Sequence, residues 1–105
     1  MIDVTEHELN IILAIIEEYI PDCEVRAFGS RVNGQAKAYS DLDLAIVGKS
    51  KLDRNMIFDM KERFQESELT FRVDLLDWHT VSPEFQKVIE AGYEVIFQKK
   101  DRGQE

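Results

Sequence analysis

The chain has 105 residues, of which 44% are hydrophobic and 32% charged, and its 21 acidic and 13 basic residues give a net charge of −8. This length and balance favour one compact domain and argue against an intrinsically disordered chain. The excess of acidic residues also disfavours direct binding to a long nucleic acid, because like charges repel.

The N-terminus and the cysteine count narrow the class of protein further. No uninterrupted run approaches the roughly 18 apolar residues of a membrane-spanning helix, and the first residues lack the basic start of a secretory signal. We therefore expect a cytoplasmic protein that does not enter a membrane. Cys23 is the single cysteine, so it cannot form an internal disulfide, and it cannot make a zinc site alone.

Helix and strand signals alternate along the chain. Thr5 and Glu8 have the spacing of a capping box, Asp53 is a plausible helix cap, and Ser82 precedes a first-turn proline. The predicted elements are a helix over 6–19, a strand over 24–28, a helical turn and loop over 30–40, a strand over 41–47, a helix over 54–66, a strand over 71–78, a helix from 83 to near 92, and an edge strand over 94–98.

This order predicts the fold class. Helices that alternate with strands imply an α/β (α+β) arrangement in which helices pack on a sheet. In the last helix we expect Phe85, Val88 and Ile89 to face inward. The prediction is a single domain over residues 1–98, followed by a wholly polar tail over 99–105.

Two aspartates lie on the second predicted strand. Side chains alternate along a strand, so Asp41 and Asp43 point to one face while Leu42 and Leu44 point to the other, into the core. A solvated sheet face is the alternative explanation, although aspartate is depleted in strand interiors.

A third aspartate lies on the next predicted strand. Asp74 shares a face with Arg72, whereas Asp77 faces the same way as Val73 and Leu75. One interpretation is a surface ion pair between Arg72 and Asp74. The other places Asp74 beside the first two aspartates, where two carboxylates about 5 Å apart would repel by roughly 3 kcal/mol. Such a cluster would need a cation, and Mg²⁺ is a hard ion that prefers oxygen ligands.

The turn after the first strand could hold an anion. Gly29 lets a phosphate approach the backbone, the Ser30 hydroxyl can donate a hydrogen bond, and Arg31 could add a positive charge. A Gly-Ser pair alone is usually only a turn, and a surface role for Arg31 is the alternative.

In combination these residues resemble a known family. The run from Phe28-Gly-Ser-Arg-Val-Asn-Gly to Ser40-Asp-Leu-Asp-Leu-Ala-Ile-Val47, with Asp74 about thirty residues later, resembles the signature of the minimal nucleotidyltransferases, the smallest members of the DNA polymerase beta-like superfamily. The resemblance spans about residues 8 to 98. It implies the nucleotidyltransferase fold, a small mixed β-sheet flanked by helices.

The resemblance also implies a catalytic site. By position, Asp41 and Asp43 would ligate two Mg²⁺ ions, and Asp74 would complete the site of the catalytic ion. Gly29 and Ser30 would hold the β- and γ-phosphates of ATP or another nucleoside triphosphate. Arg31 is an additional candidate for the phosphate contact.

A partner and an activity follow from the same resemblance. Family members of this size often accompany a small helical HEPN-type toxin, and they act as antitoxins by transferring AMP from ATP to a tyrosine of that partner. The resemblance therefore implies a protein adenylyltransferase. The alternative is a non-catalytic module that binds nucleotide or partner and neutralises the partner by occlusion. Whether the chain forms a homo-oligomer is left open.

Overall fold

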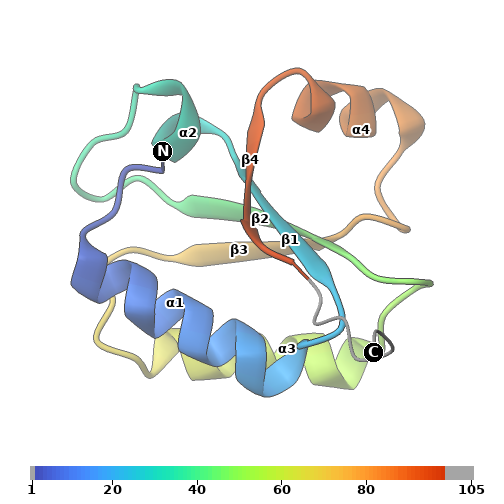
Figure 1. The fold of residues 1–105 in the computed structure, drawn as a ribbon, viewed down its shortest axis with the longest axis horizontal. Coiled ribbons are helices and arrows are strands. Elements are labelled where there is room, and N and C mark those ends of the chain that lie inside the picture. The colour runs from blue at the N-terminus through green and yellow to red at the C-terminus, as the bar shows by residue number, and fades with distance from the viewer. Residues whose placement is uncertain (1, 99–105) are drawn as a thin grey trace, which may run out of the picture.

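The computed structural model describes residues 2–98 and contains four helices and four strands among them (Figure 1). The elements in chain order are α1 (Glu6–Tyr19), β1 (Glu24–Phe28), α2 (Ser30–Asn33), β2 (Leu42–Val47), α3 (Arg54–Gln65), β3 (Val73–Asp77), α4 (Pro83–Glu90) and β4 (Tyr93–Phe97). The predicted polar tail, 99–105, lies outside the described residues.

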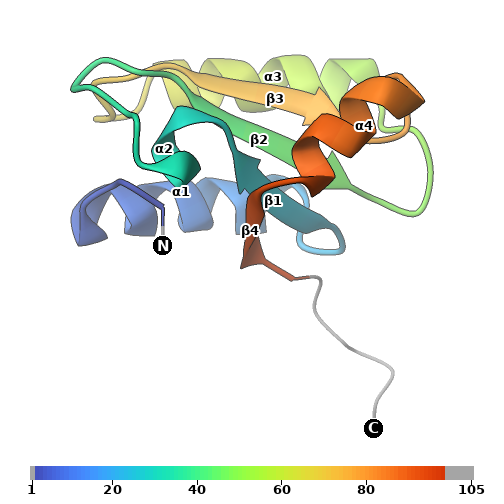
Figure 2. The ribbon, with the colours of Figure 1, turned by 90° about the horizontal axis from the view of Figure 1, so that it is seen from above.

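The strands form one mixed sheet in the order β3-β2-β1-β4. β1 is antiparallel to both β2 and β4, whereas β2 and β3 are parallel. Figure 2 shows β2 and β3 side by side and running in the same direction. The parallel pair requires a crossover, which α3 supplies. The crossover places the beginnings of β2 and β3 at the same end of the sheet.

Side-chain caps fix where the three longer helices begin. The Thr5 hydroxyl accepts a hydrogen bond from the Glu8 amide while the Glu8 carboxylate accepts one from the Thr5 amide, which is a complete capping box. Asp53 caps α3 and Ser82 caps α4. These caps confirm the predicted starts of all three helices.

Two predicted strands begin later than expected. β2 begins at Leu42 rather than Asp41, and β3 begins at Val73 rather than Phe71. The Leu42 amide donates to the Arg72 carbonyl at 2.9 Å, where the two strands come together. Asp41 therefore lies just before its strand, beside Arg72.

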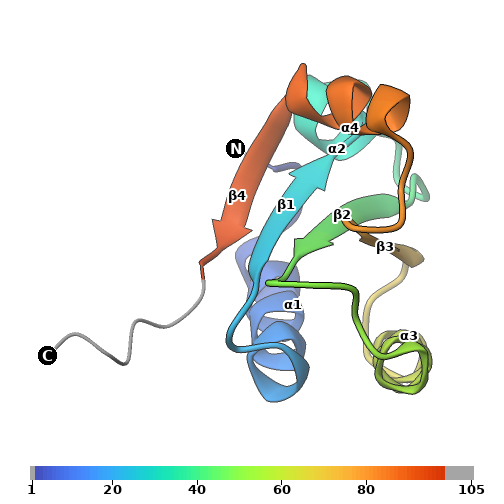
Figure 3. The same cartoon turned by 90° about the vertical axis from the view of Figure 1, so that its right-hand side faces the viewer.

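The main core lies between the sheet and the pair α1 and α3, which cover the same face (Figure 3). It is built from side chains that recur at helical spacing in α1 and α3 and at alternate positions in the strands. Its fully buried members include Ile12, Ile15, Ile16, Val25, Leu42, Leu44, Ile46 and Met60. The predicted inward direction of Leu42 and Leu44 is confirmed, so Asp43 between them points to the opposite face.

Helix α4 packs on that opposite face. Ile89 is buried against Phe28 and Ala45, and the rings of Phe85 and Phe28 meet edge to face at 6.0 Å. Val88 is 61% exposed, so the prediction that it faces inward was wrong. Phe85 faces Phe28 but is still 37% exposed, so the same prediction holds for it only in part. The line of contact of this short helix runs between Phe85 and Ile89, which turns Val88 toward solvent. Among residues 2–98, no helix is both long enough and apolar enough to cross a membrane.

Candidate active site

The parallel pairing of β2 and β3 brings two aspartates together. Asp43 and Asp74 are register partners on neighbouring strands, so their side chains project from the same face of the sheet. Asp41 precedes β2 at the same end of the sheet. The crossover through α3 therefore joins carboxylates that are about thirty residues apart in the sequence.

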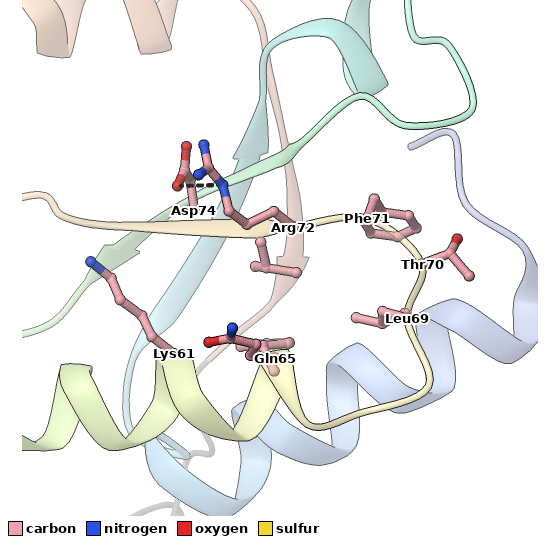
Figure 4. Close-up of a pocket in the computed structure, with 9 residues that line it drawn as sticks. Lys61, Gln65, Leu69, Thr70, Phe71, Arg72 and Asp74 are labelled. Carbon is pink, nitrogen blue, oxygen red and sulfur yellow. Dashed lines mark ion pairs between the residues drawn. The ribbon is translucent and has the colours of Figure 1, made fainter.

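Arg72 lies between two of these carboxylates. Its Nη2 atom is 2.8 Å from Asp41 Oδ2. Its Nε atom is 3.8 Å from Asp74 Oδ1, and Figure 4 shows this second ion pair. The Arg72–Asp74 ion pair considered from the sequence is therefore present, but the shorter contact is with Asp41. The sequence indicated Arg72 only as a partner of Asp74.

The two aspartates of β3 have different environments. Asp77 is buried on the α1 and α3 face, where its carboxylate accepts hydrogen bonds from the amides of Leu52 at 2.8 Å and His79 at 3.0 Å. Its charge is thus used to fix the loop before α3. Asp74 is half-exposed on the other face, where Arg72 is its ion-pair partner.

The surroundings of Asp43 raise its proton affinity. Burial is the largest cause of the raised pKa of Asp43, and the negative charges of Asp74 and Asp41 raise it further, while Arg72 opposes the shift. The hydrogen bond and the attraction to Asp41 raise the pKa of Arg72 above its usual value. The cluster therefore holds more negative charge than Arg72 neutralises, which favours an added cation.

Gly29 packs directly against Asp43 at the end of β1. It has φ +84° and ψ −156°, a conformation that is essentially restricted to glycine. A Cβ atom at this position would collide with the Asp43 carboxylate. The Gly29 carbonyl accepts hydrogen bonds from the Val32 and Asn33 amides, which close the first turn of α2. The turn that carries Ser30 is thus held beside the carboxylates.

Arg31 is buried and contacts the protein's own backbone. It is 5% exposed, and its guanidinium donates to the carbonyls of Asp3 at 2.8 Å, Ser40 at 2.9 Å and Ala38 at 3.1 Å. It also lies 3.9 Å from the centre of the Phe71 ring. These contacts anchor the loop before β2. The alternative of a surface role for Arg31 was therefore wrong. Backbone carbonyls engage the guanidinium's donors, which are thus not free for a phosphate.

A pocket of about 610 Å³ begins at the cluster and follows the edge of the sheet. It runs between β3 and α3, and Figure 4 shows Arg72 and Asp74 on its β3 side and Lys61 and Gln65 on its α3 side. Phe64 and Val73 contribute an apolar floor. No sequence pattern marked this pocket, because it depends on the packing of α3 beside β3.

The carboxylate oxygens are of the donor type that suits a hard divalent cation, but their positions do not yet form a metal site. Among residues 2–98, no three histidine, cysteine or acidic side chains are placed so that they could hold a metal ion as they stand. Two of the three carboxylates, Asp41 and Asp74, are instead oriented toward nitrogen atoms of Arg72. Carboxylate oxygens on neighbouring strands remain the donor type that Mg²⁺ prefers.

Comparison with known families agrees with this fold. Residues 10–102 match the family described as Polymerase beta, Nucleotidyltransferase. The match covers most of the chain, so the chain belongs to this family of nucleotidyltransferases. The membership confirms the resemblance found in the Gly29-Ser30 turn and the Asp41-x-Asp43 strand, and with it the expected fold and enzyme class.

Individual relatives extend the comparison. The chain is 48% identical over 99 residues to the probable protein adenylyltransferase MntA of Haemophilus influenzae, a match that spans 94% of this chain and 87% of the relative. Two solved structures share the fold at 22% identity. One is a crystal structure of a toxin–antitoxin with AMP-PNP (TM-score 0.74, covering 88% of this chain and 74% of the other). The second is the tri-AMPylated Shewanella oneidensis HEPN toxin in complex with MNT antitoxin (TM-score 0.69, covering 90% and 72%).

Proposed function

We propose that this chain is a Mg²⁺-dependent protein adenylyltransferase that moves AMP from ATP to a tyrosine hydroxyl of a small helical HEPN-type toxin, and so acts as its antitoxin. The observation that carries the proposal is the placement of Asp43 and Asp74 on paired strands, with the Gly29 turn packed against Asp43. The relative named as a probable protein adenylyltransferase supports the acceptor class. The solved toxin–antitoxin structures support the kind of partner.

In the proposed site each residue has a separate task. Gly29 and Ser30 bind the β- and γ-phosphates through the turn at the start of α2. Asp41 and Asp43 ligate two Mg²⁺ ions, and Asp74 completes the site of the catalytic ion. When bound, the two ions neutralise the charge of the triphosphate and stabilise the entering and leaving oxygens. Most of the catalysis then comes from charge neutralisation and positioning.

The proposed reaction is an in-line transfer at the α-phosphorus. The acceptor oxygen forms a bond to the α-phosphorus, and the bond from that phosphorus to the bridging oxygen of the β-phosphate breaks. The hydroxyl proton passes to Asp74, which lies half-exposed at the mouth of the pocket. Pyrophosphate leaves, and the acceptor retains the nucleotide. We place this reaction in the cytoplasm, where ATP is available.

The test is label transfer from ATP. Incubation with α-labelled ATP, Mg²⁺ and the partner toxin should place label on the toxin, and mass spectrometry should show an increment of one or more AMP groups. The variant Asp43→Asn should lose transfer while keeping its fold. Asp59→Asn is a matched control, because Asp59 is an exposed aspartate on α3.

Two results would contradict the proposal. One is a stable complex with the partner that never acquires label, which would favour neutralisation by occlusion. The other is an Asp43→Asn protein that transfers label at the normal rate, which would remove the two-metal assignment.

A further inference from the structure

We propose that Arg72 is the resident counter-ion of the carboxylate cluster, and that it must leave Asp41 and Asp74 before a divalent cation can bind. Arg72 would thus set the cation concentration at which the site fills. The inference deepens the proposed function and rests on it, because it concerns the same carboxylates. It is argued from the contacts of the Arg72 guanidinium with two of those carboxylates.

The backbone of Arg72 is fixed while its side chain is free to move. Its carbonyl accepts the Leu42 amide at 2.9 Å, which holds the residue where β2 and β3 come together. The side chain is 72% exposed and meets the carboxylates only through its guanidinium. A swing of the side chain therefore disturbs neither the sheet nor the core.

The guanidinium and a cation need the same oxygens. Arg72 engages Oδ2 of Asp41 and Oδ1 of Asp74 at once, so it bridges two of the three carboxylates. Arg72 acts on Asp43, the third carboxylate, only through the attraction between their charges. While the bridge is in place, Asp41 and Asp74 are turned toward Arg72, and no three acidic side chains among residues 2–98 converge on one point.

Exposure makes the bridge displaceable. Ion pairs in contact with water are weak and are screened by salt. A compact divalent ion carries twice the charge of a guanidinium and binds carboxylate oxygens directly. Once displaced, Arg72 can turn toward the pocket that it already lines with Lys61 (Figure 4).

Direct binding of Mn²⁺ to the full chain tests this inference. Isothermal titration calorimetry of chelator-treated protein at low ionic strength should show that Arg72→Gln binds Mn²⁺ at least about threefold more tightly than the wild type, because the competing cation is gone. Lys61→Gln is the matched control. It removes one positive charge from the same pocket but not from the carboxylates, so its affinity should stay within about twofold of the wild type.

A melting experiment supplies a second measurement. Without divalent ions, Arg72→Gln should melt below the wild type because the carboxylates lose their counter-ion, and saturating Mn²⁺ should close the gap. Unchanged or weaker binding by Arg72→Gln overturns the inference. Equal tightening in Lys61→Gln also overturns it, because net charge would then be the cause. Mn²⁺ binding to none of the proteins would overturn it as well.

The label-transfer assay separates this inference from the proposed function. If the wild type labels its partner and Arg72→Gln binds Mn²⁺ no more tightly, only the inference on Arg72 fails. If Arg72→Gln binds more tightly and no label is transferred, only the proposed activity fails.

Discussion

At the scale of single residues, the contact between Gly29 and Asp43 links the two halves of the candidate site. Gly29 directly follows β1 and Asp43 lies on β2, and the absence of a side chain at Gly29 makes room for the Asp43 carboxylate. Gly29 therefore has two roles: it leaves space for the carboxylate, and it adopts the backbone conformation that the turn requires. A side chain there would reposition a proposed metal ligand without changing any acidic residue.

Substitution of this glycine gives the first prediction. Gly29→Ala should cost about 2–3 kcal/mol of folding free energy, because its backbone region is essentially glycine-only, and it should lose Mn²⁺ binding and transfer because the new Cβ displaces the Asp43 carboxylate. Chemical denaturation and calorimetry measure the two effects.

Gly34→Ala is the matched control for this variant. Gly34 has the same φ of +84°, but a Cβ there meets nothing within 4 Å. We expect a cost of about 1 kcal/mol and unchanged Mn²⁺ binding. Normal cation binding by Gly29→Ala would show that the Asp43 carboxylate is not held by this contact.

At the scale of elements, α2 and the loop after it are held by one buried arginine. Arg31 starts on α2 and reaches the carbonyls of Ala38 and Ser40 in the loop, the Asp3 carbonyl before α1, and the Phe71 ring before β3. It therefore ties together the segments that surround the beginning of β2. The position of Asp41 directly after Ser40 depends on this anchor.

Arg31 gives a prediction that separates anchoring from phosphate binding. Arg31→Lys keeps the charge but loses the forked set of donors. If Arg31 anchors the loop, Arg31→Lys and Arg31→Ala should both lower the free energy of unfolding by about 2–4 kcal/mol, because the several hydrogen bonds of a buried, charged side chain are lost. Urea denaturation measures this cost. A stable Arg31→Lys protein with weakened ATP binding would instead favour the phosphate contact.

At the scale of the whole molecule, the acidic cluster links stability to pH and to Mg²⁺. The folded pKa of Asp43 is raised above its unfolded value, so its ionised form costs stability. That cost is fully present above the folded pKa and disappears as the pH falls toward the unfolded pKa. A divalent cation bound to the ionised carboxylates offsets the cost, and it binds only when they are ionised.

The resulting prediction concerns thermal melting in the presence of Mg²⁺. At neutral pH, Mg²⁺ at ten times its dissociation constant should stabilise the protein by about 1.4 kcal/mol, which corresponds to roughly 6–11 °C in melting temperature for a chain of this size. The shift should fade as the pH falls through the raised pKa of Asp43, at a higher pH than for an ordinary aspartate. A chelator should reverse it, and Asp43→Asn should not show it. A shift that persists unchanged in acid would contradict the linkage.

The sequence alone predicted most of the elements and the chemical types in the site. The capping residues Thr5, Asp53 and Ser82 act on amides only a few positions away, so their effect is local and visible in the sequence. Apolar periodicity likewise indicated which side of each strand faces the core. The Gly29-Ser30 turn and the spaced aspartates were recognisable because their residue types and intervals are short patterns.

Only the tertiary structure decided how these residues are used. The pairing of Asp43 with Asp74 depends on the direction of β3, which the α3 crossover sets. Arg31 bonds to Asp3, which lies 28 positions earlier in the chain, and Arg72 bonds to Asp41, which lies 31 positions earlier. Such contacts follow from the packing of distant segments, and no local pattern of residues encodes them.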